Sequence, residues 1–110
     1  MELGLVSIPG AFSPTEIYHA HTLGADLIKV FPAGTLGPNY FRELKGPMGH
    51  LGLVATGGIT VENAPAFLRA GARVIGVGSA LVDRKLIERE DWEQLGQLAR
   101  AFRQAIESVE

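Results

Sequence analysis

Four short apolar segments alternate with helical patterns along this chain, and that alternation limits the possible folds. The apolar segments are residues 3–8, 26–31, 51–56 and 73–78, and each ends at or beside a glycine or proline. Apolar strands that alternate with helices across short loops are typical of a parallel sheet covered by helices. The sequence therefore predicts an α/β fold with the order β-α-β-α-β-α-β-α.

The helical segments carry recognisable start and stop signals. Ser13 is a good N-cap, Pro14 suits the first position of a helix, and Glu16 completes a capping box. Gly24 is placed to end this helix. Further helices are expected over residues 37–46, from Thr60 or Asn63 to Gly71, and from about Asp91 onward.

Two of these helices have further features. The third has two possible starts, because Pro65 fits poorly in a helix capped at Thr60 but well in one capped at Asn63. The last carries one apolar stripe. The stripe comprises Trp92, Leu95, Leu98, Ala99, Phe102 and Ile106.

The chain also contains an internal repeat at an offset of 47 residues. Residues 24–30 align with residues 71–77, and Gly10 aligns with Gly57. Each repeat holds two βα units, so residues 1–110 are predicted to form one half-barrel domain, half of a (β/α)₈ TIM-type barrel with helices outside. A half barrel exposes two sheet edges and an inner face. We therefore expect either a homo-oligomer in which a second copy closes the barrel, or a missing N-terminal half.

Composition argues against several classes of function. A net charge of −2 without a basic run argues against a nucleic-acid partner, and the apolar runs are too short to span a membrane. The absence of cysteine excludes disulfides and thiolate metal sites, and it fits a cytoplasmic protein. His19 and His21 lie two residues apart on a predicted helix and make a poor metal pair, and His50 is expected to be solvated. No metal and no cofactor are expected.

Lys29 is the clearest candidate for chemistry. Strand periodicity places Leu27, Lys29 and Phe31 on one face of the second strand. Moving an ammonium group out of water is costly, so this lysine either reaches solvent from an edge strand or is kept for chemistry. Lys29 aligns with Gly76 in the repeat, which argues against a purely structural role. Apolar surroundings favour the neutral amine, which can attack a ketone as a Schiff-base lysine.

Two glycine-rich segments follow the third and fourth predicted strands. They contain Gly57 and Gly58, and then Gly78 and Ser79. In (β/α)₈ barrels the loops after the last two strands often bind phosphate together with the N-terminus of a short helix. Glycines let backbone N–H groups approach an anion, and the Ser79 hydroxyl would add a donor. These four residues are therefore predicted to bind phosphate; the alternative is that the glycines only allow tight turns.

The segments IPGAFSPTEI, IKVFPAG, ATGGIT and GVGSAL occur in this order, and with them residues 8–82 resemble the C-terminal half of the 2-keto-3-deoxy-6-phosphogluconate (KDPG) aldolase family. That family includes the 4-hydroxy-2-oxoglutarate aldolases. The resemblance implies a homotrimer of (β/α)₈ barrels. It also implies a lyase activity that splits KDPG, which is a phosphorylated keto acid, into pyruvate and glyceraldehyde 3-phosphate.

The resemblance also implies a role for individual residues. Lys29 resembles the catalytic lysine that forms an imine with pyruvate. In the family a glutamate base and a substrate-binding arginine come from the N-terminal half, which corresponds to no part of residues 1–110. The implied substrate-binding positions are Pro9, Phe31, Pro32 and Thr56, and the implied phosphate-binding positions are Gly57, Gly58, Gly78 and Ser79.

Three functions remain open from the sequence. The first is a Schiff-base aldolase or the lysine-bearing half of one. The second is a catalytically silent half barrel that binds a phosphorylated ligand, because no carboxylate ends a predicted strand and an aldolase needs a proton shuttle. The third is another phosphate-sugar barrel enzyme, such as an isomerase or synthase, which would not need an imine-forming lysine.

Overall fold

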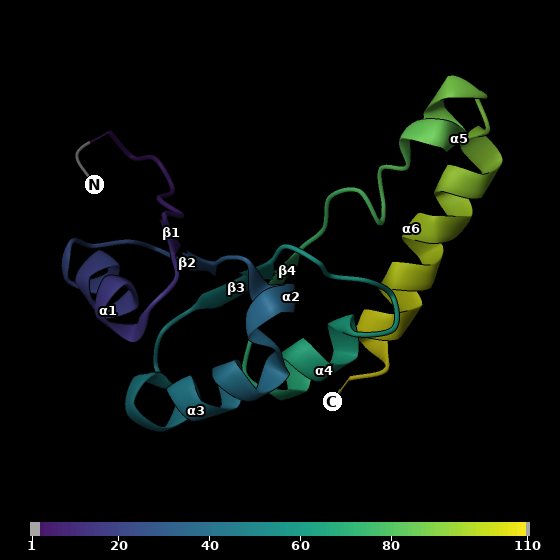
Figure 1. Cartoon of the computed structure of the whole chain (residues 1–110). Coiled ribbons are helices and arrows are strands. Elements are labelled where there is room, and N and C mark those ends of the chain that lie inside the picture. The colour runs from purple at the N-terminus through teal and green to yellow at the C-terminus, as the bar shows by residue number, and fades with distance from the viewer. Residues whose placement is uncertain (1–2, 110) are drawn as a thin grey trace.

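A four-stranded parallel sheet forms the centre of the protein (Figure 1). The computed structural model describes residues 3–109. Every neighbouring pair of strands is parallel, and the strands follow one another in sequence order across the sheet. The predicted α/β fold is confirmed. The strands are β1 (Gly10–Ala11), β2 (Ile28–Val30), β3 (Leu53–Thr56) and β4 (Val74–Gly76).

Helices connect the strands, and two of them are absent from the sequence prediction. The unpredicted helices are short: α2 covers four residues and ends at Gly37, where φ is 83°, and α5 is capped by the Asp83 side chain. None of the helices within residues 3–109 has the length and apolar character needed to cross a membrane. The helices are α1 (Pro14–Thr22), α2 (Ala33–Leu36), α3 (Pro38–Met48), α4 (Ala64–Arg69), α5 (Arg84–Glu88) and α6 (Trp92–Glu107).

The predicted helix starts are largely confirmed. At α1 the Ser13 hydroxyl accepts from the Glu16 N–H, and the Glu16 carboxylate accepts from the Ser13 N–H at 2.9 Å, which is a complete capping box. At α6 the Asp91 carboxylate accepts from the N–H of Gln94. The ambiguous helix starts at Ala64 with Asn63 as its cap residue, which places Pro65 in the first turn where it is tolerated.

The first predicted strand is wrong in its position. Residues 3–8 form no strand, and β1 begins only at Gly10. Contact with the next strand still starts early, since the Ser7 carbonyl accepts from the N–H groups of both Asp26 and Leu27. Pro9 has no N–H to donate, and β1 lies at an edge with a neighbour on one side only. Residues 3–6 consequently have no second strand to hold them in a ladder.

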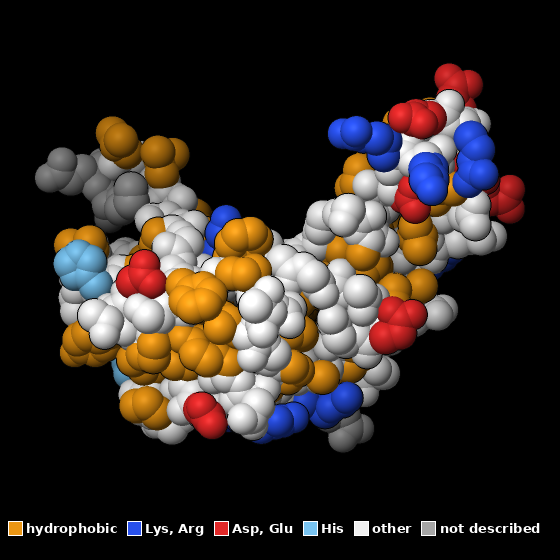
Figure 2. Space-filling model, in the orientation of Figure 1, with side chains coloured by type: hydrophobic (Ala, Val, Ile, Leu, Met, Phe, Trp, Pro, Cys, Tyr) orange, Lys and Arg blue, Asp and Glu red, His pale blue; other side chains and the backbone are white. Residues whose placement is uncertain are grey.

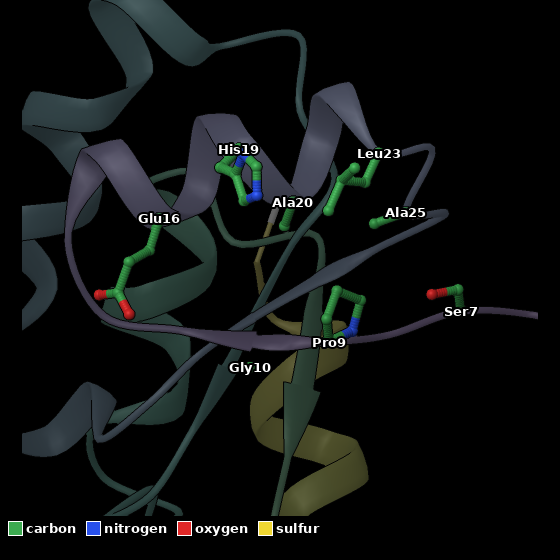
Figure 3. A pocket seen from close by; sticks show the side chains of 8 residues that line it. All are labelled: Ser7, Pro9, Gly10, Glu16, His19, Ala20, Leu23 and Ala25. Carbon is green, nitrogen blue, oxygen red and sulfur yellow. The ribbon is translucent and has the colours of Figure 1, made fainter.

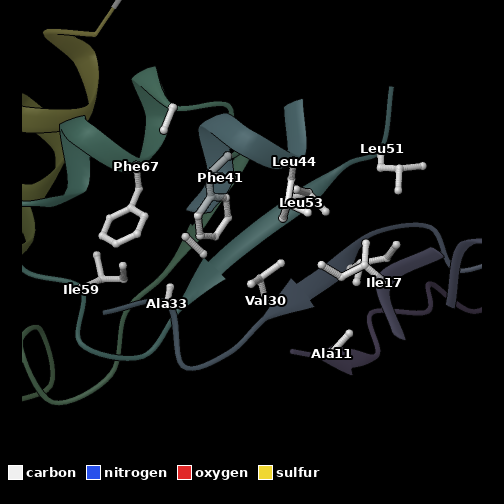
Figure 4. Close-up of a cluster of buried hydrophobic side chains, with 14 of the residues drawn as sticks. Ala11, Ile17, Val30, Ala33, Phe41, Leu44, Leu51, Leu53, Ile59 and Phe67 are labelled. Atoms are coloured by element: carbon white, nitrogen blue, oxygen red, sulfur yellow. The ribbon is translucent and has the colours of Figure 1, made fainter. Parts of the chain in front are cut away.

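The hydrophobic core lies between the sheet and the helices on one of its faces (Figure 4). Val30 points into it from β2, and both Ile28 and Val30 are almost fully buried. The Phe41 ring of α3 meets the Phe67 ring of α4 edge to face, with centroids 5.4 Å apart. Lys29 lies between Ile28 and Val30 in the strand and therefore faces away from this core. In the space-filling view the molecule is hollowed between its N-terminal segment and the arm formed by α5 and α6 (Figure 2).

Candidate functional site

The side chain of Lys29 projects from the middle of β2 on the face opposite the core. Lys29 pairs in register with Gly10 of β1 and Val54 of β3, and paired residues of parallel strands point to the same face. A Cβ atom added at Gly10 would lie 3.3 Å from the Lys29 Cε atom. The absence of a side chain at Gly10 thus makes room for the lysine stem. We call this face of the sheet, with Lys29 at its centre, the inner face.

The Lys29 amine has an aromatic neighbour and no carboxylate partner among the described residues. Its Nζ atom lies 5.3 Å from the centre of the Phe31 ring, within the range of a cation–π contact. Phe31 follows two residues later on the same face and is 49% exposed. Within residues 3–109 the one ion pair joins Arg103 to Glu107 on α6. The amine is therefore half-buried, flanked by an apolar ring and open to a small molecule arriving at the inner face.

Thr56 stands at the carboxyl end of β3 and shares the inner face with Lys29. It pairs with Gly76 of β4, where an added Cβ atom would lie 2.5 Å from the Thr56 Oγ1 atom. Gly76 stands where the other repeat has Lys29, and the space that its missing side chain leaves is occupied by the Thr56 hydroxyl. Gly10 pairs with Lys29, so the 47-residue offset predicts that Gly57 pairs with Gly76. The observed partner of Gly76 is Thr56, so the register in the second half of the repeat is shifted by one residue.

Gly57 and Gly58 have a clear structural role. Their φ angles are 97° and 71°, a left-handed conformation that favours glycine. A Cβ atom at Gly57 would lie 2.9 Å from the Phe31 ring, and one at Gly58 would lie 3.2 Å from the Gly34 Cα atom. The Gly34 N–H also donates to the Gly57 carbonyl at 2.7 Å. These two glycines therefore let the turn after β3 close over the segment that follows β2.

Gly78 and Ser79 follow the neighbouring strand and are exposed. The Gly78 carbonyl accepts from the N–H groups of Leu81 and Val82, at 3.0 and 2.9 Å, so a turn forms there. The next helix, α5, begins at Arg84, so no helix starts directly at this turn. Because β3 and β4 are adjacent and parallel, the two glycine-rich segments leave the same edge of the sheet.

Pro9 is the one predicted substrate-binding residue that the structure separates from the others. It lines a cavity of about 370 Å³ between the N-terminal segment and α1, together with Glu16 and His19 (Figure 3). Gly10 faces Lys29, so Pro9 beside it in the strand points toward the opposite face. The structure brings Lys29, Phe31 and Thr56 together on the inner face, and Pro32 follows directly at the carboxyl end of β2. It leaves Pro9 on the α1 side.

Glu16 and Tyr40 hold the loop that follows β1, a function that the sequence analysis did not assign to Tyr40. The Glu16 carboxylate accepts from the backbone N–H and hydroxyl of Ser13 and from the N–H of Phe12. These hydrogen bonds, led by the Ser13 N–H, lower the pKa of Glu16. The Tyr40 hydroxyl donates to the Phe12 carbonyl at 2.6 Å, and its pKa is raised by burial and then by the nearby Glu16 charge.

The three histidines are exposed, as predicted, and two of them meet across the fold. The rings of His21, at the end of α1, and His50, before β3, lie edge to face with centroids 5.5 Å apart. Residues 3–109 contain no group of three or more side chains of the metal-ligating types.

Comparison with known proteins places this geometry in a family. The family model for KDPG and KHG aldolase matches residues 1–98. The chain is 30% identical, over 94% of its length, to a 2-dehydro-3-deoxy-6-phosphogalactonate aldolase of Escherichia coli. It is 33% identical, over 90% of its length, to a 2-dehydro-3-deoxy-phosphogluconate aldolase of Haemophilus influenzae. These alignments cover 51% and 47% of the two relatives, so the chain spans about half the length of the curated relatives it matches.

Solved structures agree with this assignment. A structure described as native KDPGal is 30% identical to this chain and superposes with a TM-score of 0.80. The superposition covers 96% of this chain and 52% of the KDPGal chain. A thiamine phosphate pyrophosphorylase of Pyrococcus furiosus superposes with a TM-score of 0.77 at 24% identity over 97% of this chain and 52% of its own, which shows a shared fold alone. With the fold of half a TIM-type barrel and the family match over most of its length, the chain belongs to the KDPG and KHG aldolase family.

Proposed function

We propose that this chain carries the Schiff-base lysine of a class I aldolase, with Lys29 as the nucleophile. One observation carries the proposal: the Lys29 amine lies on the open inner face beside Phe31, in a member of an aldolase family. The names of the relatives point to a phosphorylated 2-keto acid, either KDPG or its galactonate epimer, as the substrate. The family name adds 4-hydroxy-2-oxoglutarate, the substrate of the KHG branch.

The chemistry follows from an amine placed next to a ketone. The neutral Lys29 amine attacks the C2 carbonyl carbon, and loss of water leaves an imine that becomes protonated. The protonated imine accepts the electron pair of the C3–C4 bond as that bond breaks, while a base takes the proton of the C4 hydroxyl. The aldehyde leaves, the enamine is protonated at C3, and water releases pyruvate and restores the amine.

The surrounding residues suggest how the substrate would lie. Phe31 lies beside Lys29 at the carboxyl end of β2 and is followed directly by Pro32, and the Thr56 hydroxyl projects from the neighbouring strand on the same face as Lys29. These groups would hold the keto-acid end. The segments containing Gly57–Gly58 and Gly78–Ser79 leave the adjacent strands, where backbone N–H groups and the Ser79 hydroxyl would receive the phosphate.

The proton shuttle is the part of the reaction that residues 3–109 do not supply at Lys29. No carboxylate in this range forms an ion pair with the amine, and Glu16 is held in the capping box of α1. The structure thus favours a reaction in which Lys29 forms the imine and residues outside 3–109 supply the base. A catalytically silent half barrel that binds a phosphorylated ligand is the second candidate, supported by the same observation.

Borohydride trapping with pyruvate tests the proposal. Incubation with pyruvate and reduction should add one reduced pyruvate group to the chain, and peptide mass spectrometry should locate it at Lys29. Lys29→Ala should abolish the adduct, while Lys45→Ala, which removes an exposed lysine of α3, should leave it unchanged. Absence of the adduct in a chain with a normal circular-dichroism spectrum would contradict the aldolase proposal.

Phosphate binding separates the two candidates. Titration with glyceraldehyde 3-phosphate, followed by ³¹P NMR, should show binding that survives Lys29→Ala and weakens in Ser79→Ala. Binding without any pyruvate adduct would favour the silent half barrel. Loss of both properties in Lys29→Ala would mean that the substitution unfolds the chain, and the circular-dichroism spectrum would show it.

A further inference from the structure

Two aromatic side chains lie at the carboxyl ends of neighbouring strands, close to the lysine. Ala11 of β1 pairs with Val30 of β2, and both are buried in the core. The next pair in the same register is Phe12 with Phe31, on strands about 4.8 Å apart. Because side chains alternate along a strand, Phe12 lies on the inner face together with Phe31. Both rings are close to half exposed, so a small molecule at the inner face can reach them.

The backbone of Phe12 is held by side chains from two different helices. The Tyr40 hydroxyl of α3 donates to the Phe12 carbonyl at 2.6 Å. Glu16 points from α1 toward the loop that follows β1 (Figure 3), and its carboxylate accepts from the Phe12 N–H at 3.3 Å. The same carboxylate accepts from the Ser13 N–H at 2.9 Å. Both polar backbone groups of Phe12 are thus fixed beyond the point where β1 ends.

Tyr40 is itself firmly placed. Its ring packs against the hydrophobic core and meets the Phe41 ring edge to face, with centroids 6.5 Å apart. Burial, and then the nearby Glu16 charge, raise the pKa of Tyr40, so its hydroxyl keeps its proton and remains a donor at neutral pH. The hydroxyl therefore ties the loop after β1 to the core, across 28 residues of sequence.

The space around the Lys29 amine is open over one residue of β1 and closed at the next one on that face. A Cβ atom at Gly10 would lie 3.3 Å from the Lys29 Cε atom and 3.9 Å from its Nζ atom, so the amine leans over Gly10. Phe12 follows two residues later on the same face, at a spacing of about 6.6 Å. A molecule joined to the amine therefore has free space over Gly10 and meets the Phe12 ring beyond it.

We propose that Phe12 is a specificity-determining residue of the Lys29 site, and that Tyr40 and Glu16 are positioning residues that hold its ring beside the amine. The ring leaves room for a 2-keto acid whose C3 carries one substituent or none, and it excludes one that is branched at C3. A branched C3 has two methyl groups and cannot turn both of them away from the ring. The inference rests on the imine chemistry proposed for Lys29.

Borohydride trapping with an equimolar mixture of pyruvate and 3-methyl-2-oxobutanoate measures this selectivity. The unchanged chain should give mainly the pyruvate adduct at Lys29. Phe12→Ala should raise the ratio of branched adduct to pyruvate adduct about tenfold or more, because one or two methyl groups in an apolar pocket change selectivity by this much. A substitution that only loosened the fold would weaken both adducts together and leave their ratio unchanged.

Tyr40→Phe tests the positioning role, since it removes the hydroxyl and keeps the ring that packs against the core. It should raise the same ratio about two- to tenfold, the range that one hydrogen bond can supply. In the Phe12→Ala background it should add little, because the ring that it positions is gone. Tyr18→Phe removes an exposed tyrosine hydroxyl of α1 and is the matched control, which should leave the ratio unchanged.

Proton NMR measures the position of the ring independently of the reaction. Nuclear Overhauser effects from the Phe12 ring protons to the side chains of Lys29 and Phe31 should be present in the unchanged chain. In Tyr40→Phe they should weaken, while those between the Phe41 and Phe67 rings of the core should remain.

The results separate this inference from the aldolase proposal. Adducts whose ratio neither Phe12→Ala nor Tyr40→Phe changes would overturn the inference and leave the aldolase proposal standing. A Phe12 ring without contact to Lys29 or Phe31 would overturn it on geometry, whatever the trapping gives. Absence of both adducts in a folded chain would contradict the aldolase proposal, and the inference would fall with it.

Discussion

Thr56 and Gly76 show, at the scale of single residues, how closely adjacent strands are matched on the inner face. The threonine hydroxyl occupies the place where a side chain at Gly76 would begin, and Gly10 makes the corresponding room beside Lys29. In each case a glycine on one strand gives space to a polar side chain on its neighbour. The positions of the two polar groups therefore depend on residues that carry no functional group themselves.

Gly76→Ala should destabilise the fold by about 1–3 kcal/mol, because the added methyl group would overlap the Thr56 Oγ1 atom. Thr56→Ala removes that oxygen, so the double variant should recover most of the loss. Urea unfolding of the two single variants and the double variant measures this coupling. Gly78→Ala is the control, since an added Cβ atom there meets nothing within 4 Å, and it should change stability little. Additive effects of the first two substitutions would contradict the packing described.

At the scale of elements, α1 is anchored by a capping box that depends on an ionised carboxylate. Hydrogen bonds from the loop after β1 keep the pKa of Glu16 below its usual value in the folded protein. A group whose pKa is lowered on folding stabilises the fold at pH values above its unfolded pKa of 4.5, and this contribution is lost as the pH falls through the folded value. The start of α1 is therefore sensitive to acid.

Glu16→Gln should lower the urea midpoint at pH 7, because the amide lacks the charge that strengthens these hydrogen bonds. The difference from the unchanged protein should shrink below about pH 4.5, as the carboxylate itself becomes protonated. Urea titrations across this pH range measure the difference. Glu62→Gln, at an exposed position before α4, is the control and should show no such trend. A difference that stays constant down to pH 3 would argue against the role of the Glu16 charge.

At the scale of the whole molecule, the sheet is firmly held in its centre and weakly held at its first edge. β3 has a neighbour on each side and buries nearly all of its side chains, whereas the backbone hydrogen bonds of Ser7 and Pro9 go to β2 and to the two residues before it. Leu3, Leu5 and Val6 at this edge are among the most exposed of the large apolar side chains described. Backbone protection should therefore differ sharply between residues 3–6 and residues 51–54, which both read Leu-Gly-Leu-Val.

Hydrogen exchange measured by NMR should show this difference directly. In the dilute, monomeric protein the Leu5 amide should exchange close to the unfolded rate, while the Leu53 amide should exchange only on global unfolding. Equal protection of the two amides in the monomer would contradict the open edge.

The amino-acid sequence by itself determined the strands β2, β3 and β4, the longer helices, and the faces to which the β2 side chains point, but not the short helices α2 and α5. Apolar residues alternate in β2, so Ile28 and Val30 enter the core while Lys29 and Phe31 share the other face, and this follows from backbone geometry alone. The starts of α1 and α6 were also predictable, because Ser13 and Asp91 form capping hydrogen bonds with residues only three positions away.

Only the tertiary structure decided which segments form the edges of the sheet and which side chains meet across neighbouring strands. Leu-Gly-Leu-Val becomes part of β3 at residues 51–54 and no strand at residues 3–6, because a strand is stabilised by neighbours that may be distant in sequence. The separation of Pro9 from Lys29, and the contact of Gly76 with Thr56, likewise follow from strand register. A change of one residue in register moves a side chain to the opposite face, and only the pairing of distant segments fixes that register.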